Sequence, residues 1–155
     1  VFDLVDPMEG GPSYLLYTQD FYNIAKSKLG PHGVLVTQAG PAGPLNYAEC
    51  FTAIAHTLAG VFPRTYPYSV FMPSFVTEWG FVMAVNGATA PSGDSDPETS
   101  GPEHIDSLIT ERLTKPLRFY DGVTHRSMFS LPSYLRQGLE AEHRTVTDNE
   151  PVFMV

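Results

Sequence analysis

Two aspartates follow a short apolar run at the start of the chain, where residues 1–12 are Val-Phe-Asp-Leu-Val-Asp-Pro-Met-Glu-Gly-Gly-Pro. An apolar run that leads into proline and glycine is typical of a buried strand that ends in a loop. In open α/β sheets, ligands bind just beyond the carboxyl ends of strands, so Asp3 and Asp6 suit a cationic ligand or a proton transfer. For either aspartate alone a turn-stabilising role stays open, because Asp side chains commonly bond the local backbone.

Size and charge narrow the function classes. A chain of 155 residues is long enough for one domain with a real core. Its net charge of −8 argues against nucleic acid as a partner, since phosphate contacts need clustered Lys and Arg. The same charge would steer a polycationic small molecule toward the protein.

Cysteine and histidine usage gives further limits. The single cysteine, Cys50, excludes an internal disulfide and fits a reduced, cytoplasmic setting. Cys50 falls in a predicted helix, where a small buried apolar residue is a better interpretation than a nucleophile. The five histidines are scattered without metal-ligand spacing, so we expect no metal site. We also expect no signal peptide and no membrane span.

The pattern of apolar residues predicts an α/β fold. The predicted sheet is parallel first and antiparallel at its edge, and helices cover it. The first predicted helix has an apolar face of Phe21, Ile24, Ala25 and Leu29, and the second has one of Phe51, Ile54, Ala55 and Leu58. Thr18 would cap the first helix, and Asn46 would start the second. The predicted strands are 1–6, 33–38, 64–72 and 79–86, and the last two are β-rich and close enough in sequence to form a hairpin. The predicted helices are 19–29, 46–62, 105–113 and 131–142.

The domain organisation follows from composition. Residues 88–103 are rich in Pro, Gly, Ser, Asp and Glu, which predicts a flexible loop. We expect residues 1–87 to form the main part of one domain, and residues 104–155 to form a helical appendage of the same domain. The chain opens inside a strand-like segment without a methionine, which suggests the second half of a longer protein.

Several short motifs occur here in a fixed order and together carry a resemblance. They are the acidic segment 3–12, Tyr-Thr-Gln-Asp-Phe-Tyr at 17–22, the strand and loop 33–41, Pro-Ser-Phe at 73–75 and Trp-Gly-Phe at 79–81. In this order they resemble the C-terminal half of the polyamine aminopropyltransferases, the spermidine and spermine synthase family. The acidic motif has two more residues before its last proline than the family's general pattern. That longer form, with segments 38–43, 119–122 and 128–131, looks like the plant-type thermospermine branch.

The resemblance implies a Rossmann-like, class I methyltransferase-like mixed sheet, of which this chain is the C-terminal half with a short helical appendage. It also implies transfer of an aminopropyl group from decarboxylated S-adenosylmethionine to a polyamine, with methylthioadenosine released. No metal or other cofactor is implied. The glycine-rich loop that holds the nucleoside of the donor would lie upstream and has no counterpart in this sequence.

Residue roles carry over by motif match. Asp3 is expected to accept the proton of the amine, and Asp6 to hold the amine chain. Phe75 stands where many spermidine synthases have a tyrosine, which suggests a longer, more apolar acceptor path and favours a triamine. For Trp79, core packing in an edge strand is an equally good interpretation. The further expected contacts are Gln38 and Trp79 with the amine, and Pro12 with the adenine side of the donor.

Two functions therefore stay open. The first is a polyamine aminopropyltransferase, with spermidine converted to thermospermine as the expected reaction and the family's usual homodimer when full length. The second is a non-catalytic fragment that binds polyamines or docks on a partner, because the donor site is missing. A small-molecule methyltransferase is disfavoured, since such an enzyme needs no paired carboxylates for a polyamine.

Overall fold

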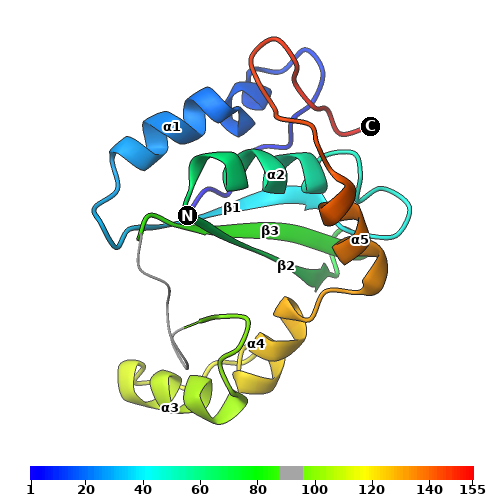
Figure 1. Cartoon of the computed structure of the whole chain (residues 1–155). Coiled ribbons are helices and arrows are strands. Elements are labelled where there is room, and N and C mark those ends of the chain that lie inside the picture. Colours follow the sequence, from blue (N-terminus) through cyan, green and yellow to red (C-terminus); the bar gives the residue numbers. More distant parts are fainter. Residues whose placement is uncertain (88–95) are drawn as a thin grey trace.

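The computed structural model describes residues 1–87 and 96–155, in which a three-stranded sheet carries helices on both faces (Figure 1). The strand order is β1-β3-β2, and both pairs are antiparallel. Helices α1 and α2 cover one face, and α3 and α4 lie on the other. The strands are β1 (Val34–Pro41), β2 (Arg64–Met72) and β3 (Thr77–Val85). The helices are α1 (Gln19–Ser27), α2 (Phe51–Val61), α3 (Pro102–Arg112), α4 (Gly122–Phe129) and α5 (Ser133–Ala141), with a 3₁₀ helix, η1 (Pro12–Tyr17).

The predicted α/β class and the β2–β3 hairpin are confirmed, but the predicted strand over residues 1–6 is wrong. Its parallel pairing with β1 consists of one bridge, between Phe2 and Thr37. Beyond that bridge, side chains rather than a neighbouring strand bond the backbone: Gln38 donates to the carbonyl of Leu4 and Tyr17 donates to that of Val5. The backbone carbonyls of residues 4 and 5 are thus bonded by side chains instead of a neighbouring strand.

Helix α1 begins as predicted. The Thr18 hydroxyl accepts a 3.3 Å hydrogen bond from the Phe21 amide, which satisfies a free donor of the first turn. The predicted apolar face is wrong at Ile24, which is 59% exposed, and omitted Tyr22, which is fully buried. The buried stripe of this helix is thus shifted toward its tyrosine.

Helix α2 has the predicted apolar face, since Phe51, Ile54, Ala55 and Leu58 are all buried. Its predicted start at Asn46 is wrong, because residues 44–50 form turns and the helix begins at Phe51. Cys50 occupies the position before the helix and is fully buried, as a small apolar residue would be.

The β3 surface that receives α2 is flat at Gly80. A Cβ at this glycine would collide with the ring of Phe51, so the close approach of the helix to the sheet requires glycine here.

The last third of the chain differs in part from the prediction. Helix α5 matches the predicted 131–142 helix, and α3 starts at Pro102, which suits the first turn of a helix. The sequence interpretation missed α4, which Asp121 caps by accepting a 2.7 Å bond from the Thr124 amide. Of the predicted loop 88–103, residues 88–95 lie outside the described residues, 96–99 form a turn, and 102–103 belong to α3.

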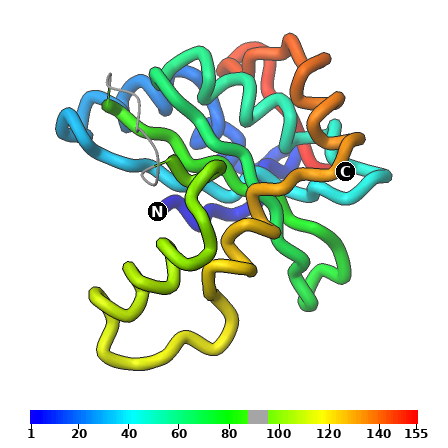
Figure 2. Tube along the Cα trace, turned by 60° about the horizontal axis from the view of Figure 1, so that its bottom comes forward, coloured from blue at the N-terminus to red at the C-terminus, as the bar shows by residue number. Residues whose placement is uncertain are grey.

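One hydrophobic cluster draws on both ends of the chain. It joins Tyr17, Phe51 and Val82 to Leu135 and Val146. In Figure 2, α3 and α4 project from the rest of the molecule, whereas the segment after α5 returns beside the start of the chain. No helix within residues 1–87 and 96–155 combines the length and apolar character needed to cross a membrane.

Candidate functional site

The carboxamide of Gln38 lies at the centre of a buried polar network. Its Nε2 group lies within 3.0 Å of the Leu4 carbonyl and Asp6 Oδ1 and within 2.6 Å of the Tyr17 hydroxyl. Its Oε1 atom accepts from the Gly40 amide at 3.1 Å and the Trp79 indole at 2.8 Å. Every polar atom of this side chain thus has protein partners, so a direct bond from Gln38 to a ligand would require one of them to be exchanged.

A bulge in β1 makes this arrangement possible. The register between β1 and β3 shifts between Gln38 and Gly40. Gly40 has φ +87°, a left-handed conformation that favours glycine, and this turns its amide toward the side chain of Gln38. A strand without the bulge would point this amide into the ladder instead.

Asp6 is held by both its side chain and its backbone. Gln38 donates to Oδ1, while the Asp6 carbonyl accepts from the Ser13 hydroxyl and the Met8 amide, both at 2.8 Å. Within the described residues, the second carboxylate oxygen has no hydrogen-bond partner. Asp6 therefore offers one free anionic acceptor in a fixed orientation.

Tyr17 joins the network from η1. The ring is fully buried, and its hydroxyl bonds the Val5 carbonyl and receives the bond from Gln38. Burial, then the negative charge of Asp6, raises the pKa of the Tyr17 phenol far above its usual range, and Asp3 adds to this rise. Both carboxylates thus act on one buried hydroxyl.

From the sequence alone, Tyr17 fits a lid over the ligands and packing in the core or a loop equally well. Its position directly before the capping residue Thr18, which fixes it at the junction of loop and helix, was the available signal.

Trp79 and Phe75 form an aromatic wall beside Gln38. Trp79 is 7% exposed, and the ring of Phe75 lies 4.3 Å from it, centroid to centroid, at 39°. Phe75 is 51% exposed. The residue after it, Val76, has φ +52°, which is rare for a β-branched residue. The hairpin turn thus presents an apolar ring to solvent next to the network.

The structure brings together four of the six predicted residues, namely Asp6, Gln38, Phe75 and Trp79. Asp3 is exposed and has no hydrogen-bond partner within the described part of the chain, so its carboxylate is open to a ligand. Pro12 is exposed at the first position of η1, beside the Ser13 that bonds Asp6.

A cavity of about 780 Å³ lies elsewhere, between the sheet and the α3–α4 pair. Its walls include Tyr68, Arg64, His125 and Phe129, and none of the described residues that line it is an Asp or Glu. Because this described lining offers a cation no carboxylate, we place the candidate site at Asp6 rather than in this cavity. No group of three His, Cys, Asp or Glu side chains within residues 1–87 and 96–155 could hold a metal ion.

Comparison with known proteins decides the family. The profile of the spermine/spermidine synthase domain matches residues 1–97. The chain belongs to this family. The spermine/spermidine synthase relatives include a polyamine aminopropyltransferase of Hyperthermus butylicus, 42% identical over 99% of this chain and 48% of its own length. A thermospermine synthase of Arabidopsis thaliana is 38% identical over 99% of this chain and 43% of its own length. The chain thus spans about half the length of the curated relatives it matches.

Solved structures of the family show the same fold. A spermidine synthase from Thermotoga maritima has a TM-score of 0.64 and 25% identity, covering 86% of this chain and 42% of its own. A spermidine synthase in complex with the transition-state analogue AdoDATO has a TM-score of 0.62, also at 25% identity, covering 82% and 39%. The predicted Rossmann-like fold and the predicted family are confirmed.

Proposed function

We propose that these residues form the amine-binding side of the active site of a polyamine aminopropyltransferase. The reaction would move an aminopropyl group from decarboxylated S-adenosylmethionine to a polyamine, with spermidine as acceptor and thermospermine as product. The observation that carries the proposal is the Gln38 network, which holds Asp6 with one free carboxylate oxygen next to an aromatic wall. Carboxylates with apolar walls suit a chain of methylenes that carries ammonium groups.

In this mechanism Asp3 and Asp6 have different roles. Asp6 would hold the amine chain by a charge-assisted hydrogen bond, because Gln38 fixes its carboxylate and Ser13 fixes its backbone carbonyl. Asp3 would take the proton that the reacting nitrogen must lose, because its carboxylate has no partner in the described residues. General-base catalysis of this kind contributes roughly 10²–10⁴-fold in rate.

The bond changes balance without a further reactant. The nitrogen lone pair attacks the carbon next to the sulfonium, the C–S bond breaks, and its electron pair neutralises the sulfur of the departing methylthioadenosine. The nitrogen proton goes to Asp3. The leaving group starts as a cation, so no acid is needed. What the protein supplies is the alignment of nitrogen, carbon and sulfur.

The remaining residues would contact the acceptor amine and the donor. Phe75 and Trp79 would pack on methylenes of a long acceptor. Gln38 would act on the amine chiefly by orienting Asp6 and Trp79. Pro12 would lie against the adenine of the donor, whose other contacts belong to a part of the fold that this chain lacks. The homodimer and cytoplasmic location of the family remain part of this proposal.

The test is a product assay of the full-length gene product. Decarboxylated S-adenosylmethionine is supplied with spermidine or putrescine, and mass spectrometry with chromatographic standards separates thermospermine, spermine and spermidine. Thermospermine as main product supports the whole proposal. Formation of spermidine from putrescine supports the aminopropyl transfer but overturns the proposal that spermidine is the acceptor. Absence of any aminopropyl product would overturn both.

A second candidate function is polyamine binding without catalysis. The observation that favours it is coverage, since the chain matches only about half the length of its relatives. Titration of the 155-residue chain with spermidine, followed by calorimetry, tests it. Saturable binding that Asp6→Asn abolishes would support binding by this chain alone, and no heat at millimolar spermidine would count against it.

A further inference from the structure

Residues 142–155, which we term the strap, connect three parts of the molecule that are distant in sequence. We propose that the strap is a positioning element of the candidate site: it fixes the loop after Asp6 and thereby sets the affinity for the amine. This inference rests on the proposed function for its link to the amine.

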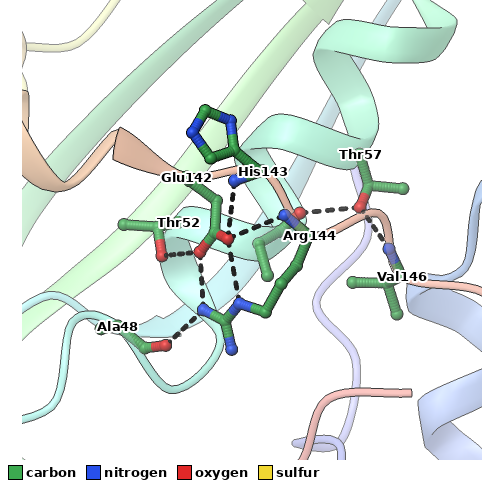
Figure 3. A network of polar contacts seen from close by, with 8 residues as sticks. Ala48, Thr52, Thr57, Glu142, His143, Arg144 and Val146 are labelled. Atoms are coloured by element: carbon green, nitrogen blue, oxygen red, sulfur yellow. Dashed lines mark hydrogen bonds and ion pairs between the residues drawn. The ribbon is translucent and has the colours of Figure 1, made fainter. Parts of the chain in front are cut away.

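The first end of the strap is fixed to the start of α2 (Figure 3). The Glu142 carboxylate accepts from the Thr52 hydroxyl at 2.6 Å and from the Arg144 guanidinium at 2.6 and 2.9 Å. Arg144 also donates to the Ala48 carbonyl at 2.6 Å. Burial alone would raise the pKa of Glu142, but the bonds from Arg144 and Thr52 outweigh it and lower the pKa to about 2. The carboxylate thus stays charged and holds this end at neutral pH.

The middle of the strap passes between α2 and α1. Val146 is 1% exposed, its amide donates to the Thr57 hydroxyl at 2.8 Å, and its carbonyl accepts from the Gln19 amide at 2.8 Å. Thr147 and Glu150 then exchange backbone hydrogen bonds at 3.2 Å, which reverses the chain. This reversal directs the last residues back toward the acidic segment.

The far end of the strap reaches the residue after Asp6. The Met154 amide donates to the Pro7 carbonyl at 2.9 Å, and the ring of Phe153 meets that of Tyr14 edge-on, 5.6 Å between centroids. Pro7 is buried, whereas Met8 is 46% exposed and Glu9 and Gly10 are exposed. The strap therefore contacts the loop at the point where it leaves the buried network.

Four consecutive carbonyls explain why this contact matters. Those of residues 4, 5, 6 and 7 accept in turn from Gln38, Tyr17, Ser13 and Met154. Three of these donors belong to β1 and η1, and the fourth belongs to the strap. Asp6 lies inside this series and Pro12 lies beyond it, so loosening the strap should disturb the amine side more than the donor side.

The experiment compares Phe153→Ala with Phe153→Tyr, which keeps the ring, and with Phe119→Ala, which removes an aromatic side chain that is 65% exposed. In the 155-residue chain, amide exchange is measured at Met8 and Gly11, whose amides donate to the Asp6 and Met8 carbonyls. We expect exchange about tenfold faster in Phe153→Ala only, because a less restrained loop opens more often. Unchanged exchange at both amides would overturn the proposal that the strap fixes the loop after Asp6.

The link to the amine is measured in the full-length gene product. We expect Phe153→Ala to raise KM for the amine about tenfold, with KM for the donor little changed and Phe153→Tyr close to wild type. Faster exchange with an unchanged amine KM would overturn the link, as would an equal rise in both KM values. If the wild type forms no product, the proposed function is wrong, while the exchange result still decides whether the strap restrains the loop after Asp6. If Phe153→Ala does not fold, Phe153→Leu, which keeps apolar volume without the ring, takes its place.

Discussion

The indole nitrogen of Trp79 donates a 2.8 Å hydrogen bond to the carboxamide oxygen of Gln38, which joins β3 to β1 beside Asp6. Trp79 is the only tryptophan of the chain. Its fluorescence in the 155-residue chain therefore reports on the candidate site itself. This makes unfolding and ligand binding measurable at one residue.

Gln38→Leu should lower the free energy of unfolding by about 2–4 kcal/mol, because it leaves the buried Trp79 indole and the Gly40 amide without their partner and removes one of the hydrogen bonds of the Tyr17 hydroxyl. Urea unfolding followed by Trp79 fluorescence and by circular dichroism gives the value. Gln137→Leu is the matched control, since Gln137 is exposed on α5 and within the described residues bonds only Ser133, so this substitution should lower the free energy of unfolding by no more than about 0.5 kcal/mol. Equal costs for the two variants would contradict the central place given to Gln38.

Acid should release the first end of the strap. The folded pKa of Glu142, about 2, lies below the roughly 4.3 of a free glutamate, so its stabilisation is full above pH 4.3 and is lost as pH falls toward 2. The stability gap between wild type and Glu142→Gln should therefore be largest near neutral pH and should shrink as pH falls through that window. Glu140→Gln, at an exposed position of α5, is the control for the loss of one negative charge. A gap for Glu142→Gln that stays constant from pH 6 to pH 2 would contradict the predicted pKa.

Phe75→Tyr should shift acceptor preference toward the shorter amine. The new hydroxyl would stand on the exposed ring beside Trp79, where it could bond an amine that Phe75 can only contact through methylenes. We expect the ratio of kcat/KM for spermidine over putrescine to fall about tenfold in the full-length gene product. Phe119→Tyr, on another exposed ring, should leave the ratio unchanged. An unchanged ratio in Phe75→Tyr would remove the basis for assigning a triamine from this residue.

Local patterns were sufficient for much of the fold. The β-rich composition and short separation of the segments that form β2 and β3 predicted the hairpin, and the spacing of Phe51, Ile54, Ala55 and Leu58 predicted the buried face of α2. The predicted strand over residues 1–6 was wrong because two side chains, Gln38 and Tyr17, take the backbone acceptors that a strand partner would use. Hydrogen bonds of this kind, between residues distant in sequence, produce no periodic pattern that could be recognised in the sequence.

The sequence predicted several residues of the candidate site, but not the hydrogen bonds that connect them. The acidic motif and the strand position of Gln38 led to residues that the structure brings together, since Gln38, Asp6 and Trp79 are bonded in one network. The central role of Tyr17 depends on burial and the bulge at Gly40, neither of which a spacing rule reveals. The strap was missed for a similar reason: its contact with Pro7 joins residues at opposite ends of the chain through the backbone amide of Met154.

The most direct test of the account is the turnover number of Asp3→Asn in the full-length gene product, with decarboxylated S-adenosylmethionine and spermidine as substrates. Asp20→Asn, at an exposed position of α1, serves as the matched control. We predict that Asp3→Asn lowers kcat roughly 10²–10⁴-fold while Tm stays the same, because the nitrogen loses its proton acceptor and an exposed side chain contributes little to stability. A turnover number equal to that of wild type and Asp20→Asn would contradict the role of Asp3 and, with it, the proposed mechanism.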